Sequence, residues 1–362
     1  MTRVLHLHDA DADYQTRRGV EALTRGAGRG FDARAETLGG GWSTFLRFNG
    51  RGAARSAGGA AVVHAWGGKA LASAVLSGAG RIVYSPTTFP SRRAVRWLRA
   101  AMDYRDVQVV CATATQRRRF VEGGVPLGRC HLIRPGVDFA RVRRRRDPGL
   151  RAALGFAEGD HVVFAPGEST RAAAHEDAVW AGAIASILDP RVKVLLWGRG
   201  ERVVAAAARA RQLVGGSLLS VATSRLGGAV EYEGLLAAVD SVMVTARGPV
   251  ATLPIAVCMA AGLPIVSTVT YTVAELLEDR HTALMVPRHS APRLARRLID
   301  LREDAGTQWS IADVARTEAY EYFSLTRFLD QWRGVYRQVG AGQAVEVVEP
   351  QPGAGQRFHA RV

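Results

Sequence analysis

Short apolar runs rich in β-branched residues recur along this chain, and longer segments separate them. This alternation restricts the fold more than any other feature of the sequence. In the first part the runs lie at 4–8 (VLHLH), 61–66 (AVVHAW), 81–85 (RIVYS) and 107–113 (VQVVCAT). Such runs are typical of parallel strands that are buried on both faces and connected by crossover helices. The first part of the chain is therefore predicted to form a doubly wound α/β domain.

A second series of apolar runs begins after the basic stretch at 141–149 (RVRRRRDPG). Segments with helical spacing, such as 176–188 and 291–303, lie between these runs. We therefore expect an α/β protein with two doubly wound, Rossmann-like domains in tandem, joined by a linker near 136–148. The predicted strands of the second domain lie at 161–167, 192–200, 218–223, 241–246, 263–268 and 283–287.

The last structured segment is predicted at 323–339, where apolar residues recur with the spacing of a helix. We interpret it as a closing amphipathic helix. The chain beyond it is rich in Gly, Pro and Gln, and this composition predicts disorder over 341–362. The apolar positions of the helix are Phe328, Leu329, Trp332, Val335, Tyr336 and Val339.

Length and composition favour a soluble protein with two cores. The chain has 362 residues, of which 48% are hydrophobic, and domains usually stop growing well before this length. No stretch approaches the roughly 18 to 20 apolar residues that span a bilayer, and the N-terminus lacks the features of a signal peptide. The widely spaced Cys111, Cys130 and Cys258 indicate neither a disulfide framework nor a zinc site. A reducing cytoplasm fits these observations best.

The positive charge is concentrated in the first part of the chain. Of the net charge of +15, residues 1–150 contribute all, with 26 Lys and Arg against 11 Asp and Glu, whereas residues 151–362 hold 22 of each. A one-sided basic domain attracts phosphates, anionic lipid or nucleic acid. Only Lys69 and Lys193 are lysines, so the Arg dominance is also consistent with a genome-wide bias. No nucleic-acid-binding motif accompanies the charge, and we do not expect a nucleic-acid partner.

Two passages resemble family 4 glycosyltransferases. The segment 117–140 contains Gly-Val-Pro at 124–126 and Arg-Pro-Gly-Val-Asp at 134–138, and it is similar to the helix, turn, strand and hinge that join the two halves of that family. Gly136 permits the φ values that a domain crossover needs. The segment 235–287 resembles the donor-binding core, with Leu-Pro-Ile at 253–255 and Glu275 ahead of a His-Thr-Ala-Leu-Met-Val strand.

The resemblance implies the GT-B fold, in which two Rossmann-like domains face each other across a cleft. It assigns 1–140 to the acceptor-side domain, 141–318 to the nucleotide-sugar domain and 319–340 to a helix that returns to the first domain, ahead of the tail at 341–362. It further implies that a sugar passes, with retention, from a nucleotide-diphosphate donor to a hydroxyl acceptor on a saccharide or lipid-linked saccharide. No metal or cofactor is expected.

The candidate site residues follow from this resemblance, except Arg171, which matches no family position and lies close enough in sequence to replace a missing cation. His64 and Arg171 are the candidate catalytic residues, although a histidine in this position is also consistent with a structural role, and Arg171 with a solvated loop. Negative charge that builds on the leaving diphosphate needs backbone amides and cations. The candidate donor and phosphate residues are Gly167, Gly198, Arg199, Val250, Ala251, Thr252, Leu253 and Glu275, and Thr252 is alternatively the N-cap of a helix.

Four positions depart from the family pattern. Pro249 and Val257 stand where active members carry two glutamates, and Glu168 and His175 stand where they carry an arginine and a lysine. Neither Pro249 nor Val257 can accept a hydrogen bond through its side chain. A catalytically degenerate binding or regulatory protein with the same fold is therefore the alternative prediction.

A basic helix is predicted at 91–105, with Arg92, Arg96 and Arg99 along one face. Such a helix can lie on an anionic membrane, where a lipid-linked acceptor would be found. The alternative is an ordinary solvated helix face. The predicted location is the cytoplasm, with peripheral attachment to the inner membrane face as an option.

Overall fold

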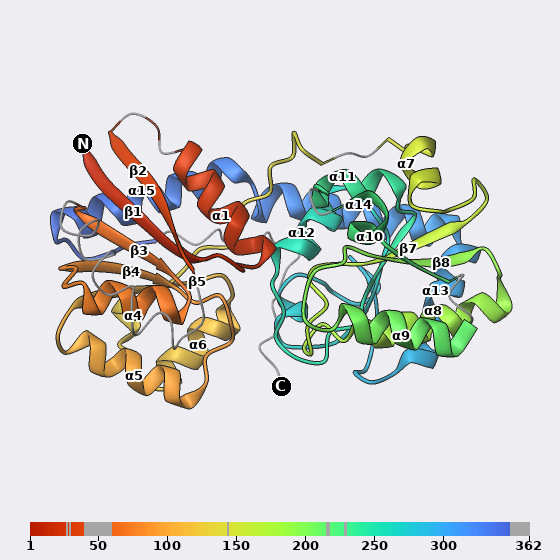
Figure 1. The fold of residues 1–362 in the computed structure, drawn as a ribbon, viewed down its shortest axis with the longest axis horizontal. Coiled ribbons are helices and arrows are strands. Elements are labelled where there is room, and N and C mark those ends of the chain that lie inside the picture. The colour runs from red at the N-terminus through yellow and green to blue at the C-terminus, as the bar shows by residue number, and fades with distance from the viewer. Residues whose placement is uncertain are drawn as a thin grey trace. The chain divides into compact units, whose positions relative to one another are not determined.

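The computed structural model describes residues 1–26, 28, 30–39, 60–142, 145–214, 218–227 and 230–347, and it contains two six-stranded parallel sheets flanked by helices (Figure 1). Contacts divide the chain into two compact units. The first comprises Met1–Gly136 together with the chain from Leu325 onward, and the second comprises Val137–Ser324. The predicted pair of doubly wound α/β domains is confirmed.

The sheet of the first unit has the order β2-β1-β3-β4-β5-β6. Neighbouring residues of one strand face opposite sides of a sheet. Val62 therefore packs on one face with α1 and α15, while Val63 packs on the other face with α4. The strands are β1 (Thr2–Asp9), β2 (Phe31–Leu38), β3 (Val62–Trp66), β4 (Arg81–Ser85), β5 (Asp106–Cys111) and β6 (Cys130–Leu132), and the helices are α1 (Tyr14–Arg25), α4 (Gly68–Leu76), α5 (Arg92–Met102), α6 (Ala114–Glu122), the 3₁₀ turn η1 (Leu127–Arg129) and α15 (Leu325–Ala341).

Two parts of the first unit differ from the sequence prediction. The edge strand β2 was not predicted, because its alternating Asp32, Arg34 and Glu36 give it too little apolar content. The region 341–347, predicted as part of a disordered tail, includes Val345, which is buried against the core beneath α15. The rest of that tail, 348–362, lies outside the described residues.

Gly136 is required for a reason other than the one expected. Its φ does not lie in the left-handed region. A Cβ at this position would instead lie 2.7 Å from the Cβ of Phe328 and 3.1 Å from the Cα of Leu325. The glycine therefore allows the close approach of α15, and the prediction that it supplies conformational freedom was wrong.

The sheet of the second unit has the order β12-β11-β10-β7-β8-β9. Helix α8 lies close to this sheet because it carries Gly182, where a Cβ would meet Val194 at 2.4 Å. The strands are β7 (His161–Ala165), β8 (Val192–Leu196), β9 (Leu219–Val221), β10 (Ser241–Val244), β11 (Ile265–Thr268) and β12 (Leu284–Val286), and the helices are α7 (Pro148–Ala153), α8 (His175–Leu188), α9 (Val203–Val214), α10 (Ala222–Leu226), α11 (Tyr232–Leu235), η2 (Leu236–Ala238), α12 (Leu253–Ala260), η3 (Val273–Glu275), α13 (Ala291–Glu303) and α14 (Ala305–Tyr322).

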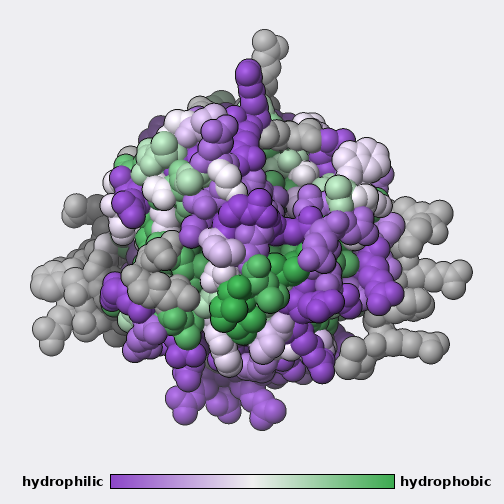
Figure 2. All heavy atoms as spheres, turned by 90° about the vertical axis from the view of Figure 1, so that its right-hand side faces the viewer, coloured by the Kyte–Doolittle hydropathy of each residue, from purple (hydrophilic) through white to green (hydrophobic). Residues whose placement is uncertain are grey.

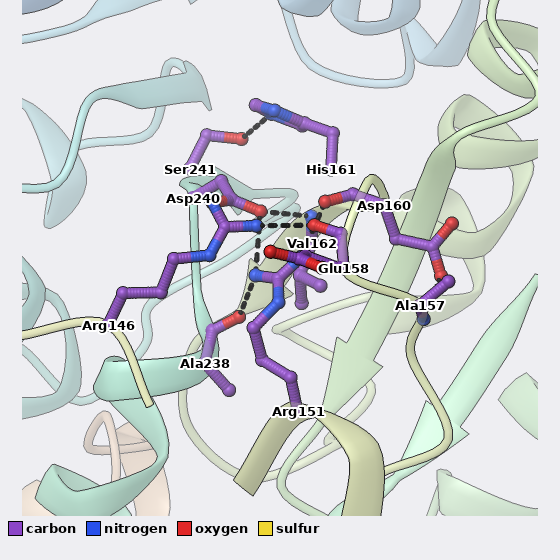
Figure 3. A network of polar contacts seen from close by, with 10 residues as sticks. All are labelled: Arg146, Arg151, Ala157, Glu158, Asp160, His161, Val162, Ala238, Asp240 and Ser241. Atoms are coloured by element: carbon purple, nitrogen blue, oxygen red, sulfur yellow. Dashed lines mark hydrogen bonds and ion pairs between the residues drawn. The ribbon is translucent and has the colours of Figure 1, made fainter. Parts of the chain in front are cut away.

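An arginine network ties the amino ends of β7 and β10 together (Figure 3). The buried Arg151 of α7 donates to Ala238 O at 2.8 Å, to Asp240 Oδ2 at 3.0 Å and to Asp160 O at 2.5 Å. Arg146 adds a second guanidinium 3.5 Å from Asp240. All of these partners belong to the second unit, so the network stabilises one end of its sheet.

The surface of the second unit carries an apolar patch among polar side chains (Figure 2). Helix α8 ends in two exposed apolar residues, with Ile187 79% and Leu188 66% exposed. No helix in the described part of the chain is both long enough and apolar enough to cross a bilayer.

Candidate functional site

Loops from neighbouring strands meet at the carboxyl edge of the second sheet. The Ser169 N–H, in the loop after β7, donates to Arg199 O in the loop after β8 at 2.7 Å, and Arg202 N–H returns a bond to Ser169 O at 2.8 Å. The Arg247 N–H, in the loop after β10, donates to Ala172 O at 2.8 Å. Ligands of open α/β sheets bind at this edge, so these loops form the candidate site.

The loop after β7 is held by a buried serine–histidine pair. His175 Nε2 lies 3.3 Å from Pro166 O, which can only accept, so Nε2 carries the proton and Nδ1 accepts from Ser169 Oγ at 2.7 Å. Burial lowers the pKa of His175 to about 4. The ring is therefore neutral near pH 7, and it shapes the loop instead of presenting a positive charge.

Glycines bring these loops into close contact. Gly167 has φ +87°, and its N–H donates to the Tyr232 hydroxyl at 3.2 Å. A Cβ at Gly198 would lie 2.0 Å from Thr223 Oγ1, and one at Gly200 would lie 2.5 Å from Ser169 O. A larger residue at 200 would therefore separate the loops after β7 and β8, and one at 198 would push the loop after β8 away from β9 and α10.

The predicted phosphate loop leads into α12. Val250 and Ala251 are half-buried, whereas Thr252 and Leu253 are buried. Thr252 stands at the N-cap position but makes no side-chain capping bond, since its backbone is already helical at φ −91° and ψ −27°. The first amide groups of a helix lack partners within that helix and favour anions. Glu275 lies half-buried in η3, on the segment that follows β11.

Arginines at this edge form ion pairs with acidic side chains of α8. Arg247 makes a bidentate ion pair with Asp177, with Nε to Oδ2 at 2.7 Å and Nη2 to Oδ1 at 2.5 Å. Its hydrogen bonds with Asp177 raise the pKa of Arg247. Arg202 pairs with Glu176 at 2.5 Å.

The two arginines predicted from the sequence also lie here. Arg199 is exposed, with its guanidinium 5.2 Å from the centre of the Trp197 ring. Arg171 has an exposed side chain, and its backbone N–H donates to Glu201 Oε1 at 3.1 Å. Both arginines belong to the loops that meet at Ser169.

Neither of the two residues that stand at the family's glutamate positions has an acidic side chain. Val257 is buried within α12, and Pro249 is exposed in the loop before it. His175 is turned inward, as described above. Hydroxyl binding by two glutamates is therefore unavailable at these positions, and any ligand must be held by backbone amides, by other polar side chains or by arginines.

His64 lies inside the first unit. Strand β3 continues to Trp66, so His64 lies within the strand and not at its carboxyl end. Its Nδ1 lies 2.7 Å from the Tyr336 hydroxyl and its Nε2 lies 2.9 Å from Ser85 Oγ, while the Trp66 ring stacks on it at 4.2 Å. Burial holds the pKa of His64 well below its usual value. This environment favours a structural role, and a part in catalysis stays a prediction.

Two polar pairs were missed by sequence reasoning. Lys69, at the start of α4, is buried and lies 2.7 Å from Asp9 at the carboxyl end of β1; the scarcity of lysine in this chain was the signal that could have found it. Arg247 lies in the loop that leaves the carboxyl end of β10 (Ser241–Val244), and a cation at such a position is itself a signal. Its partner Asp177 lies on α8, and only the folded chain brings the two together.

The comparisons with known proteins agree with this architecture. Two doubly wound units in tandem, with a final helix packed on the first, define the GT-B class of fold. Residues 172–304 match the family model described as "Glycosyl transferases group 1". That segment includes all of α8 and the loops after β8, β10 and β11, but begins after Ser169. No curated protein sequence matches the chain.

Solved structures match nearly the whole chain at low identity. The Anabaena protein HepE, solved with UDP and glucose, has a TM-score of 0.77 and 17% identity over 93% of this chain and 100% of that one. A Rickettsia africae glycosyltransferase has a TM-score of 0.75 and 15% identity, covering 93% and 98% of the two chains. Sucrose-phosphate synthase from Thermosynechococcus elongatus has a TM-score of 0.75 and 16% identity, covering 95% of this chain and 100% of that one. The chain therefore has the GT-B fold of glycosyltransferases.

Proposed function

We propose that this protein is a glycosyltransferase that moves a sugar from a nucleotide-diphosphate donor to a hydroxyl acceptor, with retention of configuration. The observation that carries the proposal is the group of loops around Ser169, Ala172 and the start of α12. They lie at the carboxyl edge of the sheet, within or beside the segment that matches a glycosyltransferase family. UDP and UDP-glucose complexes of HepE support a nucleotide-sugar donor.

The proposed donor site uses the loops for different tasks. The first-turn amides of α12, reached through Val250 and Ala251, would hold the diphosphate as its negative charge grows. Gly167 and Gly198 would let the backbone of the loops after β7 and β8 approach the nucleotide. Arg171, Arg199 and Glu275 complete the assignment, with the arginines facing phosphate and the glutamate facing hydroxyl groups. The donor enters as a substrate, and no cofactor is part of the proposal.

The test is calorimetric titration of the full chain with a panel of nucleotide-sugars, followed by turnover assays with saccharide acceptors. Binding with release of the nucleoside diphosphate is expected. If no member of the panel binds, the donor-site assignment is lost.

The second candidate is a binding or regulatory protein with the same fold. The buried Val257 and the inward-turned His175 favour it, because they remove a carboxylate and a cation that would hold the donor. Binding of a nucleotide-sugar without turnover, across a broad acceptor panel, is the result that supports this candidate over the enzyme.

A peripheral membrane location is part of the proposal. Helix α5 buries Val95 and Leu98 and exposes Arg92, Arg96 and a Trp97 side chain that is 43% exposed. Arginines beside an exposed indole suit an anionic lipid surface. We expect the protein to sediment with vesicles that contain phosphatidylglycerol and the double variant Arg92→Gln, Arg96→Gln to remain in the supernatant. Equal sedimentation of both proteins would remove this part of the proposal.

A further inference from the structure

If the protein has the proposed function, the carboxyl edge of the second sheet must supply positive charge to the donor. A nucleoside diphosphate brings several negative charges to this edge. The two positions where the resemblance places cations hold Glu168 and a neutral, buried His175. The loop after β7 therefore lacks the cations expected there, apart from the exposed Arg171.

Arg247 is the guanidinium at this edge that the structure holds most firmly. Both ends of the residue are fixed: its N–H donates to Ala172 O at 2.8 Å, and its side chain makes two hydrogen bonds to Asp177 in the first turn of α8. Asp177 lies two residues after His175, in the same helical turn. Arg247 therefore brings a cation from the loop after β10 to the first turn of α8, the turn in which His175 also stands.

The ion pair leaves part of the guanidinium available. Nε and one hydrogen of Nη2 bond to Asp177, and arginine has five N–H donors in total. The Arg247 side chain is 42% exposed, whereas that of Asp177 is 9% exposed. The acid is thus enclosed and the arginine is accessible. A guanidinium that is already positioned loses little conformational entropy when it binds phosphate.

We propose that Arg247 binds the diphosphate of the donor and that Asp177 is the positioning residue that holds its guanidinium in place. In the complex, the Nη1 group and the second hydrogen of Nη2 donate to phosphate oxygens, while Nε stays bonded to Asp177. Arg247 then supplies the charge that His175 does not.

The experiment measures binding of nucleoside diphosphates by calorimetry. A panel of UDP, GDP, ADP and dTDP first identifies the tightest ligand of the unmodified chain, and the matching nucleoside serves as the phosphate-free reference. Arg247→Gln is expected to weaken diphosphate binding about tenfold, which corresponds to about 1.4 kcal/mol, and to leave nucleoside binding unchanged. Arg211→Gln, on the exposed side of α9, removes the same charge elsewhere and is expected to change neither affinity.

Asp177→Asn separates a binding role from a merely structural one. Asparagine keeps one acceptor but turns an N–H donor toward the guanidinium, so the bidentate pair is lost. We expect diphosphate binding to weaken about threefold while nucleoside binding stays unchanged. If Asp177→Asn leaves diphosphate binding unchanged, or weakens nucleoside binding as much as diphosphate binding, Asp177 does not act by positioning Arg247 and the inference is overturned. Arg247→Lys, which keeps charge but loses the forked geometry, is expected to weaken binding about threefold; it replaces Arg247→Gln if that variant does not fold.

Failure of the proposed function and failure of the role given to Arg247 produce different results. An unmodified chain that binds no diphosphate overturns the proposed function and the inference with it. An unmodified chain that binds the diphosphate, with Arg247→Gln binding equally well, overturns the inference alone.

Discussion

Each of the two edges of the second sheet carries an arginine–aspartate ion pair, and the two pairs serve different purposes. At the amino edge, Arg151 pairs with Asp240, and its side chain is 3% exposed (Figure 3). At the carboxyl edge, Arg247 pairs with Asp177, and its side chain is 42% exposed. The chemistry of the two pairs is alike, but the first is enclosed by backbone carbonyls and the second faces solvent.

This difference shows that exposure decides what an arginine–aspartate pair can do. Arg151 donates to two carbonyl groups besides Asp240, so its donors are committed to holding α7 against the sheet. Arg247 keeps donors outside its pair. Breaking an enclosed pair leaves a buried charge without a partner, whereas an exposed pair contributes little to stability. The edges should therefore respond differently to the same substitution.

The largest effect is expected from Arg151→Met at the amino edge. The substitution removes the donor to Ala238 O and Asp160 O and the nearer of the two guanidinium partners of Asp240. We expect a loss of about 3 kcal/mol in the free energy of unfolding. Urea denaturation followed by circular dichroism measures it. Arg296→Met, in an exposed pair on α13, is the control and should lose less than about 1 kcal/mol. Similar losses in the two variants would show that the network is not structural.

Acid should destabilise both edges through their histidines. Burial lowers the pKa of His161, at the amino edge, and of His175, at the carboxyl edge, to about 4. The unfolded chain takes up these protons first, so the stabilisation is complete above pH 6.5 and is lost as the pH falls toward 4. Each neutral histidine contributes a slope of up to about 1.4 kcal/mol per pH unit.

Single histidine variants show how much of this loss of stability in acid comes from each edge. His161→Gln and His175→Gln should each reduce the slope of unfolding free energy against pH between 6.5 and 4. Only His175→Gln should also change the pH dependence of nucleotide-sugar binding, because only that ring holds the loop after β7. A changed binding profile in His161→Gln would contradict the division between a structural edge and a binding edge.

Arg247→Gln should be much milder for stability than Arg151→Met. Because the arginine is accessible and Asp177 can be reached by water once the side chain is shortened, we expect a loss of about 1 kcal/mol in the free energy of unfolding. The same urea titration measures it. A loss as large as that of Arg151→Met would remove the contrast on which the comparison depends.

The smallest effect is expected from Ser169→Ala. It removes the hydroxyl that donates to His175 Nδ1 and costs about 1 kcal/mol of unfolding free energy. The loop after β7 loses one of its constraints, and nucleotide-sugar affinity should fall about threefold, or about 0.7 kcal/mol. Ser186→Ala, on α8 with its hydroxyl bonded to Ala183 O, is the matched control. Unchanged affinity in Ser169→Ala would separate the serine–histidine pair from the site.

Much of the fold could be predicted, because buried strands and amphipathic helices leave local patterns. The helix predicted at 291–303 has those bounds in the structure, and strand 81–85 does too. Strand β2 was missed because an edge strand needs few apolar residues. The site was predicted less completely. The loops were found by resemblance, but the inward turn of His175 depends on Ser169 and Pro166, which no spacing rule connects to it.

The sequence by itself determined two tandem α/β units, the closing helix and the segments that carry the candidate site, since periodic burial is encoded residue by residue. Only the tertiary structure decided which polar side chains meet. His64 became enclosed by Trp66 and Tyr336, and Arg247 reached Asp177 across 70 residues. The physical reason is that exposure and charge pairing depend on neighbours from distant segments, and those neighbours assemble only when the sheets and their loops pack.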